Sequence, residues 1–215
     1  MMGIAEQTQD PSIDVAGNGH EDLMLMRRIA DRDTQAFETL YYGYAPRIGK
    51  FLMALLKYRE LADEAMNDTM LTVWQNAGRF DPGQGRLASW LFGIAHNKGL
   101  KLLERQRRHQ REETLDTVSG DYGQHEAEAF SAHVDVDNPE RIVLGWELGD
   151  NLLWALEQLT CEHRAVLELT FTEHCTYQEI ALITGCPVNT VKTRMFHARK
   201  KLTELLALRG YAVGS

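Results

Sequence analysis

The chain has 215 residues, of which 44% are hydrophobic, and this allows one larger domain or two small ones with a buried core. No stretch approaches the roughly 20 apolar residues of a membrane span. The N-terminus has neither the basic nor the apolar region of a secretory signal peptide. We therefore expect a cytoplasmic protein without membrane insertion.

The formal net charge is −8, but the acidic residues are unevenly placed. Residues 1–22 and 112–140 contain Asp and Glu without any Lys or Arg, and the rest of the chain is net basic. This pattern predicts that the acidity lies in a tail and a linker, whereas the folded parts are basic.

Residues 1–21 are polar and aperiodic, and we expect them to be disordered. Apolar residues at three- and four-residue spacing then predict one helix from Asp22, a second after Asp33, and a third over about 60–77. Pro46 lies inside the second helix and is expected to kink it.

The segment GRFDPGQGR, residues 78–86, contains three glycines and a proline, so it predicts a loop. A fourth helix is predicted from Leu87 to about Arg111, and its second half is strongly basic. Together these helices define a first domain over residues 22–111.

Residues 112–138 are acidic and lack an apolar period, which predicts a flexible linker. The second domain is predicted over residues 139–207, with a short tail at 208–215. Its helices are expected at about 139–158, after Thr160, and after Thr176, which forms a capping box with Glu179. No strand pattern competes, so the predicted fold is all-α, with two small helical domains.

The end of the second domain, YQEIALITGCPVNTVKTRMFHARKKL, predicts a helix-turn-helix. Gly185 suits a left-handed helix end, and Pro187 suits the first position of the last helix. In that helix the polar residues on the exposed face can contact bases, and the basic residues can contact phosphates. The DNA-contacting candidates are Asn189, Thr190, Lys192, Thr193, Arg194, His197, Arg199 and Lys200.

Two surfaces of the first domain allow alternative interpretations. Phe80 and the glycine-rich backbone after it could hold an unstacked base, with the basic helix end holding a melted strand. The same segment could equally be a plain connection followed by a solvated helix face. The acidic face of the third helix is a solvated surface or a docking surface for a basic partner helix.

No catalytic or cofactor site emerges from the residues. The glycines fit no phosphate-binding loop, and no Ser or Cys lies in a recognisable nucleophile context. Cys161, His163, His174 and Cys175 match no zinc spacing, so no structural metal is expected. We predict that the protein is not itself an enzyme and needs no cofactor.

Four stretches occur in a characteristic order: AFETLYYGYAPRI, ADEAMNDTMLTVW, GRFDPGQGRLASWLFGIAHN and the helix-turn-helix. Together they resemble bacterial RNA polymerase sigma factors of the extracytoplasmic-function (ECF) class in the sigma-70 family. The resemblance covers most of residues 22–111 and 139–206. It implies that the first domain is sigma region 2 and the second is region 4.

The resemblance also implies partners and site residues. The third helix would dock on the β′ clamp helices of core RNA polymerase, and the β flap of the polymerase is a further implied contact. The implied polymerase-binding residues are Asp63, Glu64, Asn67, Asp68 and Met70. The loop and fourth helix would capture a flipped base of the minus-ten promoter element and help to melt it. The implied minus-ten residues are Phe80, Asp81, Gln84, Arg86, Trp90, Asn97, Lys101 and Arg105.

By the same resemblance, the last helix would read the minus-thirty-five element, and the acidic linker would run through the polymerase cleft. An anti-sigma protein is expected as a further partner. The chain departs from the family pattern at Asn67-Asp68, at Asn189 and at His174-Cys175, and the last pair leaves a redox or metal response open.

The alternative function is a stand-alone helix-turn-helix regulator that binds duplex DNA. Such a regulator has no use for the stretches DTMLTVW and RLASWLFGIAHN of the first domain. A third possibility, an adaptor for protein partners only, leaves the basic last helix unexplained.

Overall fold

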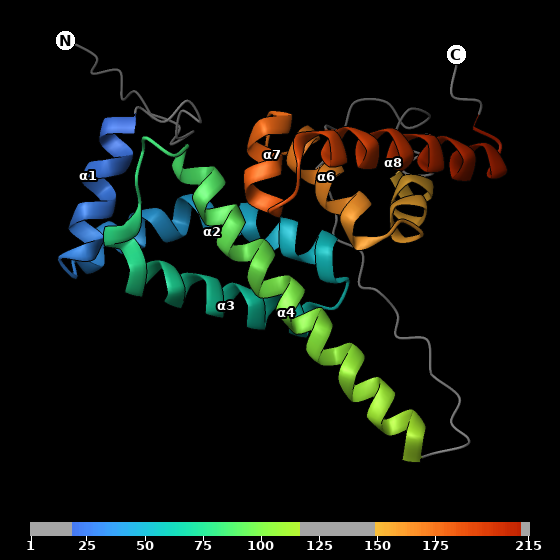
Figure 1. Ribbon diagram of the computed structural model, residues 1–215, viewed down its shortest axis with the longest axis horizontal. Coiled ribbons are helices and arrows are strands. Elements are labelled where there is room, and N and C mark those ends of the chain that lie inside the picture. The colour runs from blue at the N-terminus through green and yellow to red at the C-terminus, as the bar shows by residue number, and fades with distance from the viewer. Residues whose placement is uncertain (1–18, 117–148, 212–215) are drawn as a thin grey trace, which may run out of the picture.

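A computed structural model of the chain describes residues 19–116 and 149–211, with backbone only for 110–116. Every regular element in these two ranges is helical (Figure 1). The elements are α1 (Gly19–Ala30), α2 (Thr34–Leu56), α3 (Arg59–Asn76), the short 3-10 helix η1 (Ala77–Arg79), α4 (Leu87–Asp116), a helical segment at 149–157, α6 (Cys161–Phe171), α7 (Tyr177–Thr184) and α8 (Val188–Leu208).

Local capping interactions define several helix ends. The Asp33 carboxylate accepts hydrogen bonds from the backbone N–H groups of Gln35 and Ala36, at 3.0 and 3.2 Å, and so begins α2. Helix α2 then runs unbroken past Pro46 to Leu56, although the proline lacks an N–H and leaves one helical hydrogen bond unmade.

The first helices bury one apolar core. The rings of Phe51 on α2 and Phe92 on α4 meet edge to face with centroids 5.4 Å apart, and both side chains are fully buried. Gly99 allows α4 to approach α2 closely, because a Cβ at this position would lie only 2.6 Å from a methyl group of Leu55. This close packing fixes the direction of α4.

The helix-turn-helix forms as its sequence predicts, with one shift. The Thr176 hydroxyl accepts from the Glu179 N–H, the Glu179 carboxylate accepts from the Thr176 N–H, and Gly185 ends α7 at φ 65°. Pro187 is the residue before the first helical residue rather than that residue itself, since its ψ of 147° is extended.

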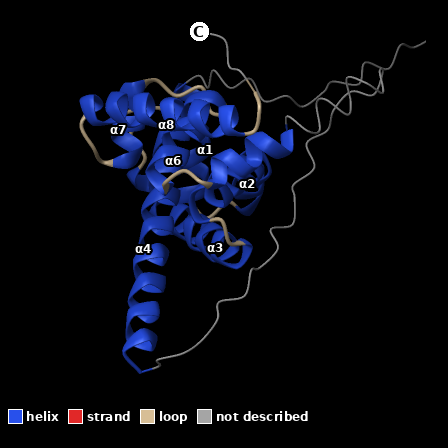
Figure 2. Cartoon of the chain, turned by 90° about the vertical axis from the view of Figure 1, so that its right-hand side faces the viewer, coloured by secondary structure: helices blue, strands red, loops and turns tan. Residues whose placement is uncertain are grey.

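The two predicted domains pack against each other rather than standing apart. Helix α7 lies on α4, where Gly93 brings the α4 backbone near Ile183, and α6 lies on the end of α2 (Figures 1 and 2). The Arg164 guanidinium of α6 donates to the backbone oxygens of Ala54 and Leu55, at 3.0 Å for Leu55. It therefore caps the C-terminus of α2 across the domain boundary.

The C-terminal half of α4 projects away from this body (Figure 2). Helix α4 continues to Asp116, so residues 112–116 of the predicted linker are helical. The rest of the predicted linker, the start of the helix predicted near residue 139, and most of both predicted tails lie outside the described residues. Helix α1 begins at Gly19, slightly before its predicted start.

Candidate polymerase and promoter interfaces

The acidic residues predicted to bind polymerase lie on one side of α3 and have basic neighbours. Glu64 pairs with Arg105 of α4 at 3.0 Å, Asp68 with Lys98 of α4 at 3.5 Å, and Asp63 with Arg59 at 3.8 Å. All three carboxylates keep substantial solvent exposure, so these pairs hold the acidic groups loosely at the surface.

Met70 does not share this face. Its side chain is 5% exposed and belongs to the core, because position 70 falls on the side of α3 that packs inward with Val73. Leu71 is exposed instead, at 53%, three residues after Asp68 and seven after Glu64. An apolar residue at helical spacing within a polar face was the signal that could have identified it.

The loop before α4 has a fixed internal structure. The Asp81 carboxylate accepts from the Gln84 side-chain amide at 3.0 Å and from the Gly83 N–H at 2.9 Å. These hydrogen bonds, led by the one from Gln84, lower the pKa of Asp81. Both side chains remain exposed, so they lie at the surface where a DNA strand can reach them.

Phe80, for which the sequence allowed either base binding or a place in a plain connecting loop, is buried in this structure. It is 7% exposed and packs at a centroid distance of 5.9 Å against Trp90, which is only partly buried. The apolar ring is covered because it completes the core between the loop and α4. Trp90 is therefore the aromatic residue of this pair with accessible surface.

Arg86 is the predicted minus-ten residue whose surroundings differ most from expectation. Its guanidinium forms an ion pair with Glu179 of α7, and the hydroxyl of neighbouring Ser89 lies 3.5 Å from the same carboxylate. The second domain thus covers the start of α4, and Arg86 is not free to contact DNA in this arrangement.

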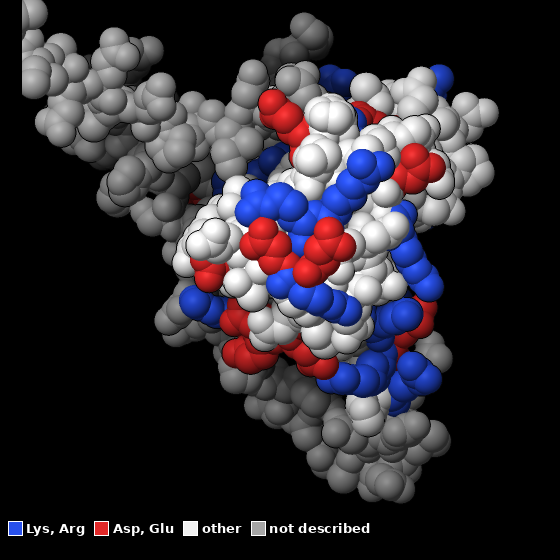
Figure 3. All heavy atoms as spheres, turned by 90° about the vertical axis from the view of Figure 1, so that its left-hand side faces the viewer, with Lys and Arg blue, Asp and Glu red and all other residues white. Residues whose placement is uncertain are grey.

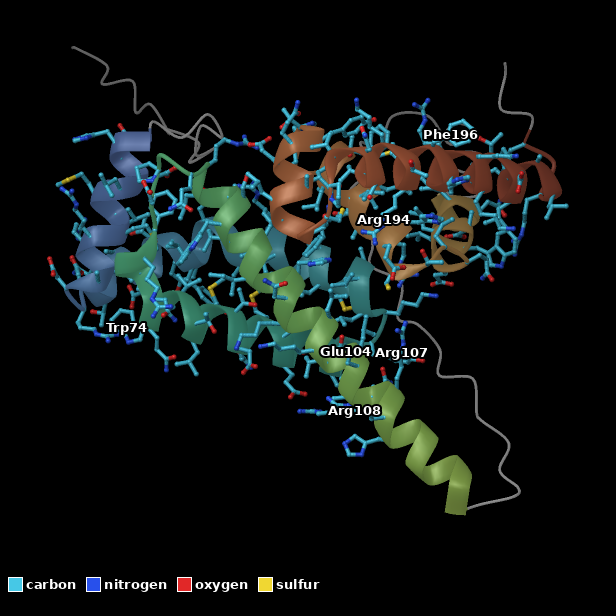
Figure 4. All side chains as sticks on the ribbon, viewed as in Figure 1. Trp74, Glu104, Arg107, Arg108, Arg194 and Phe196 are labelled. Atoms are coloured by element: carbon cyan, nitrogen blue, oxygen red, sulfur yellow. The ribbon has the colours of Figure 1, made fainter. Side chains whose placement is uncertain are left out.

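Further along α4, Asn97, Lys101 and Arg105 recur every four residues and are all exposed. Arg107 and Arg108 follow where α4 leaves the body of the molecule (Figure 4). The predicted minus-ten residues on α4 thus lie along one helix, ending in a basic, exposed segment suited to backbone phosphates.

The predicted minus-thirty-five residues lie along α8. Val191, Met195 and Ala198 form its buried side. The following candidates are exposed: Asn189, Lys192, Thr193, His197, Arg199 and Lys200. Thr190 and Arg194 are partly buried, and Arg194 donates to the Cys186 sulfur at 3.7 Å.

Phe196 was missed by the sequence reasoning, although it lies among these residues. Its ring is 64% exposed, meets His197 edge to face at 5.4 Å, and points away from the body of the molecule (Figure 4). A large exposed aromatic side chain on a helix that is otherwise polar on this side is suited to apolar contact with a base. Its position between Met195 and His197 was the available signal.

The cysteines are free thiols in distinct surroundings. Burial raises the pKa of Cys175 to about 11, with a further contribution from Glu179, so this thiol is unreactive in the folded chain. Burial also raises the pKa of Cys161. Among the described residues, no three His, Cys, Asp or Glu side chains are grouped so as to hold a metal ion. No helix in the described ranges has the length and apolar character needed to cross a membrane.

The fold and these surfaces define a class of all-helical proteins with a helix-turn-helix in the second half. Comparison with known families makes this specific. The family Sigma-70 region 2 matches residues 40–109, and Sigma-70, region 4 matches residues 150–202.

Among characterised proteins, the chain is 33% identical to the ECF RNA polymerase sigma factor RpoE of Cereibacter sphaeroides over 84% of this chain and 92% of the relative. It is 32% identical to the RNA polymerase sigma factor CarQ of Myxococcus xanthus, over 84% of this chain and 95% of the relative. The chain therefore belongs to the sigma-70 family, in the ECF class of RNA polymerase sigma factors.

Two solved structures share the fold. One is the sigma factor RpoE of Bartonella quintana in complex with the anti-sigma factor NepR, at 23% identity and a TM-score of 0.58, covering 80% of this chain and 96% of that chain. The other is CnrH in complex with the cytosolic domain of CnrY, at 21% identity and a TM-score of 0.57, covering 87% and 97%. These likenesses confirm the predicted all-helical fold.

Proposed function

We propose that this sigma factor binds core RNA polymerase through the exposed side of α3 and directs it to promoters. The observation that carries this proposal is the pairing of regions 2 and 4 in one chain, with an exposed acidic and apolar face on α3. Asp63, Glu64, Asn67 and Asp68 would contact basic groups of the β′ clamp helices, with Leu71 as the apolar anchor. The chain itself would supply specificity and no catalytic step, and it would act in the cytoplasm.

Promoter DNA would be held by two separate surfaces. The loop at 80–86 and α4 would take the minus-ten element, with Trp90 stacking on an unstacked base and Lys101 holding the backbone. Helix α8 would enter the major groove at the minus-thirty-five element. The second domain, to which α8 belongs, would rest on the β flap. A region-2 domain would bind melted DNA, whereas a stand-alone regulator binds duplex DNA only. The stand-alone regulator is therefore not favoured.

The packed arrangement of the domains is incompatible with this use. The two promoter elements lie about 25 base pairs apart, which at about 3.4 Å per base pair is roughly 85 Å along the duplex. Arg86 of the minus-ten surface is in direct contact with Glu179 of the helix-turn-helix. The chain must therefore open before it engages both elements.

An anti-sigma protein is a further proposed partner. The sigma factors of similar fold were solved with NepR and with the cytosolic domain of CnrY. A partner that binds across the two packed domains would hold this chain in the arrangement that cannot span a promoter.

Co-elution with bacterial core RNA polymerase on a sizing column tests the proposed function. We expect the wild-type chain to comigrate at moderate salt, and the variant Glu64→Lys/Asp68→Lys to elute alone, because the reversed charges repel a basic partner surface. The matched control is Asp31→Lys/Glu38→Lys, which reverses two exposed acids outside α3 and should comigrate. A wild-type chain that elutes apart from the polymerase and binds duplex DNA tightly would establish the stand-alone regulator instead.

A further inference from the structure

Four charged side chains from the two domains meet around the buried thiol of Cys175. Arg47 of α2 donates through Nε to the Glu173 carboxylate at 3.0 Å, and Arg86 pairs with Glu179. An Arg86 amino group also lies 4.0 Å from the Cys175 sulfur. All four charged groups act on that thiol. We refer to Arg47, Arg86, Glu173 and Glu179 as the interdomain charge cluster.

The two glutamates are fixed by the second domain. The Glu173 side chain is only 1% exposed, and Glu179 is held by the capping box that begins α7. The two arginines are more accessible even in the packed arrangement, with side chains 27% and 39% exposed. When the second domain moves away, it takes the carboxylates with it and leaves two guanidinium groups on the first domain.

The first domain holds Arg47 in place without Glu173. Its guanidinium lies over the rings of Tyr44 and Phe92, at 5.1 and 5.9 Å from their centroids. Cys175 links the two ion pairs, because its sulfur lies 3.8 Å from the Glu173 backbone oxygen and 4.0 Å from an Arg86 amino group. The two guanidinium groups therefore lie on the same part of the surface. Two guanidinium groups freed of carboxylates can each donate a planar set of hydrogen bonds to the oxygens of a phosphate.

We propose that Arg47 and Arg86 form a binding site for a backbone phosphate of the promoter strand at the minus-ten element, and that Glu173 and Glu179 occupy this site in the closed chain. The inference rests on the proposed function and adds Arg47, which lies in the stretch AFETLYYGYAPRI but was not among the predicted DNA-contacting residues. Phosphate and carboxylate compete for the same two arginines. Occupation of this site by phosphate and closure of the chain are therefore mutually exclusive.

The test compares variants of the full-length chain for binding of a fluorescein-labelled, mixed-sequence, single-stranded 20-mer, followed by anisotropy. Glu173→Gln keeps the side-chain volume but removes the competing charge, and we expect about 5-fold tighter binding than wild type. Adding Arg47→Gln to this variant should lose about 5-fold in affinity and lower the slope of log K against log salt by about 0.7, the value for one phosphate contact. The matched control adds Arg28→Gln, an exposed arginine on α1, and should change neither quantity.

Either of two results overturns the proposal. One is a Glu173→Gln chain that binds the oligonucleotide no better than wild type, and the other is a Glu173→Gln/Arg47→Gln chain that binds as well as Glu173→Gln. If Glu173→Gln does not fold, the wild-type and Arg47→Gln chains are compared after assembly with core polymerase, where the same 5-fold loss is expected and equal binding refutes the site. Co-elution of the wild-type chain with core polymerase reports on the proposed function separately.

Discussion

At the scale of single residues, His96 is the group most altered by folding. It lies on α4 with a 5% exposed side chain, and within the described residues its Nδ1 has no hydrogen-bond partner. Burial, with a smaller contribution from the positive charge of Arg194, lowers the pKa of His96 to about 4, and Glu162 opposes the shift. The folded chain therefore strongly prefers neutral imidazole at this position.

This preference predicts that acid destabilises the fold. Because the pKa of His96 is about 4 when folded and 6.5 when unfolded, its contribution is fully present above pH 6.5 and is lost as the pH falls toward 4. We expect the free energy of unfolding in urea to fall by about 2 kcal/mol between pH 7.5 and pH 5 from this residue alone. His96→Leu should remove that part of the pH dependence, and an unchanged pH profile in this variant would assign the acid sensitivity elsewhere.

Acidic and basic side chains are also mixed on the surface of the molecule. At the end formed by α1, basic and acidic side chains are interleaved (Figure 3), as in the Arg28–Asp33 pair at 2.7 Å. Such exposed pairs contribute little to stability. The Arg47–Glu173 pair differs, because the Glu173 side chain is only 1% exposed and loses its charged partner if Arg47 is removed.

At the scale of elements, the capping box gives a direct prediction. Thr176→Ala removes the hydroxyl that accepts from the Glu179 N–H at 3.3 Å, and we expect a loss of about 1 kcal/mol in the free energy of unfolding. Thr176→Ser keeps the hydroxyl and should lose much less. Urea denaturation of both variants checks this, and equal losses would show that the methyl group of Thr176, rather than its hydroxyl, is responsible.

The helix ends could be predicted from the sequence because capping is local. Thr160 and Thr176 accept hydrogen bonds from N–H groups three residues later, and Gly185 adopts the left-handed conformation that its position suggested. Helical spacing places Met70 on the inward side of α3, and it is buried there. The burial of Phe80 was less predictable, since it depends on how the loop meets the rest of the core. The charged and apolar sides of α3 and α8 were otherwise assigned correctly from helical spacing.

The contacts between the domains could not be predicted. Arg47 and Glu173 are 126 residues apart, and Arg164 reaches Leu55 over 109 residues. Nothing in the local pattern around either arginine distinguishes it from a solvated residue. The predicted flexible linker leaves the arrangement of the domains open, because linker composition does not determine whether the surfaces that it joins are complementary.

At the scale of the whole molecule, the two domains are held together partly by polar groups that would hydrogen-bond to water if the domains separated. Arg164 is 8% exposed, and its guanidinium donates hydrogen bonds to the backbone oxygens of Leu159 and of the α2 C-terminus. The Lys57 ammonium donates to the backbone oxygen of Glu157. In water these groups regain hydrogen bonds, so the net cost of separating them is modest. A partner that binds the separated domains can therefore open the chain.

Binding to core polymerase is predicted to separate the two domains. We expect the distance between spin labels at Glu38→Cys on α2 and Leu208→Cys at the end of α8 to lengthen on binding, since both positions are exposed and belong to different domains. Double electron–electron resonance measures this distance, in a chain with Cys161→Ser, Cys175→Ala and Cys186→Ser so that only the introduced thiols carry labels.

A label pair within the first domain, Glu38→Cys with Gln75→Cys, serves as the control and should keep its distance, because polymerase binding moves domains and leaves their cores intact. If the distance between Glu38→Cys and Leu208→Cys also stays the same in the complex, the packed arrangement is the one that the polymerase binds. The two promoter surfaces would then act in succession, because a span of roughly 85 Å is out of reach for domains in contact.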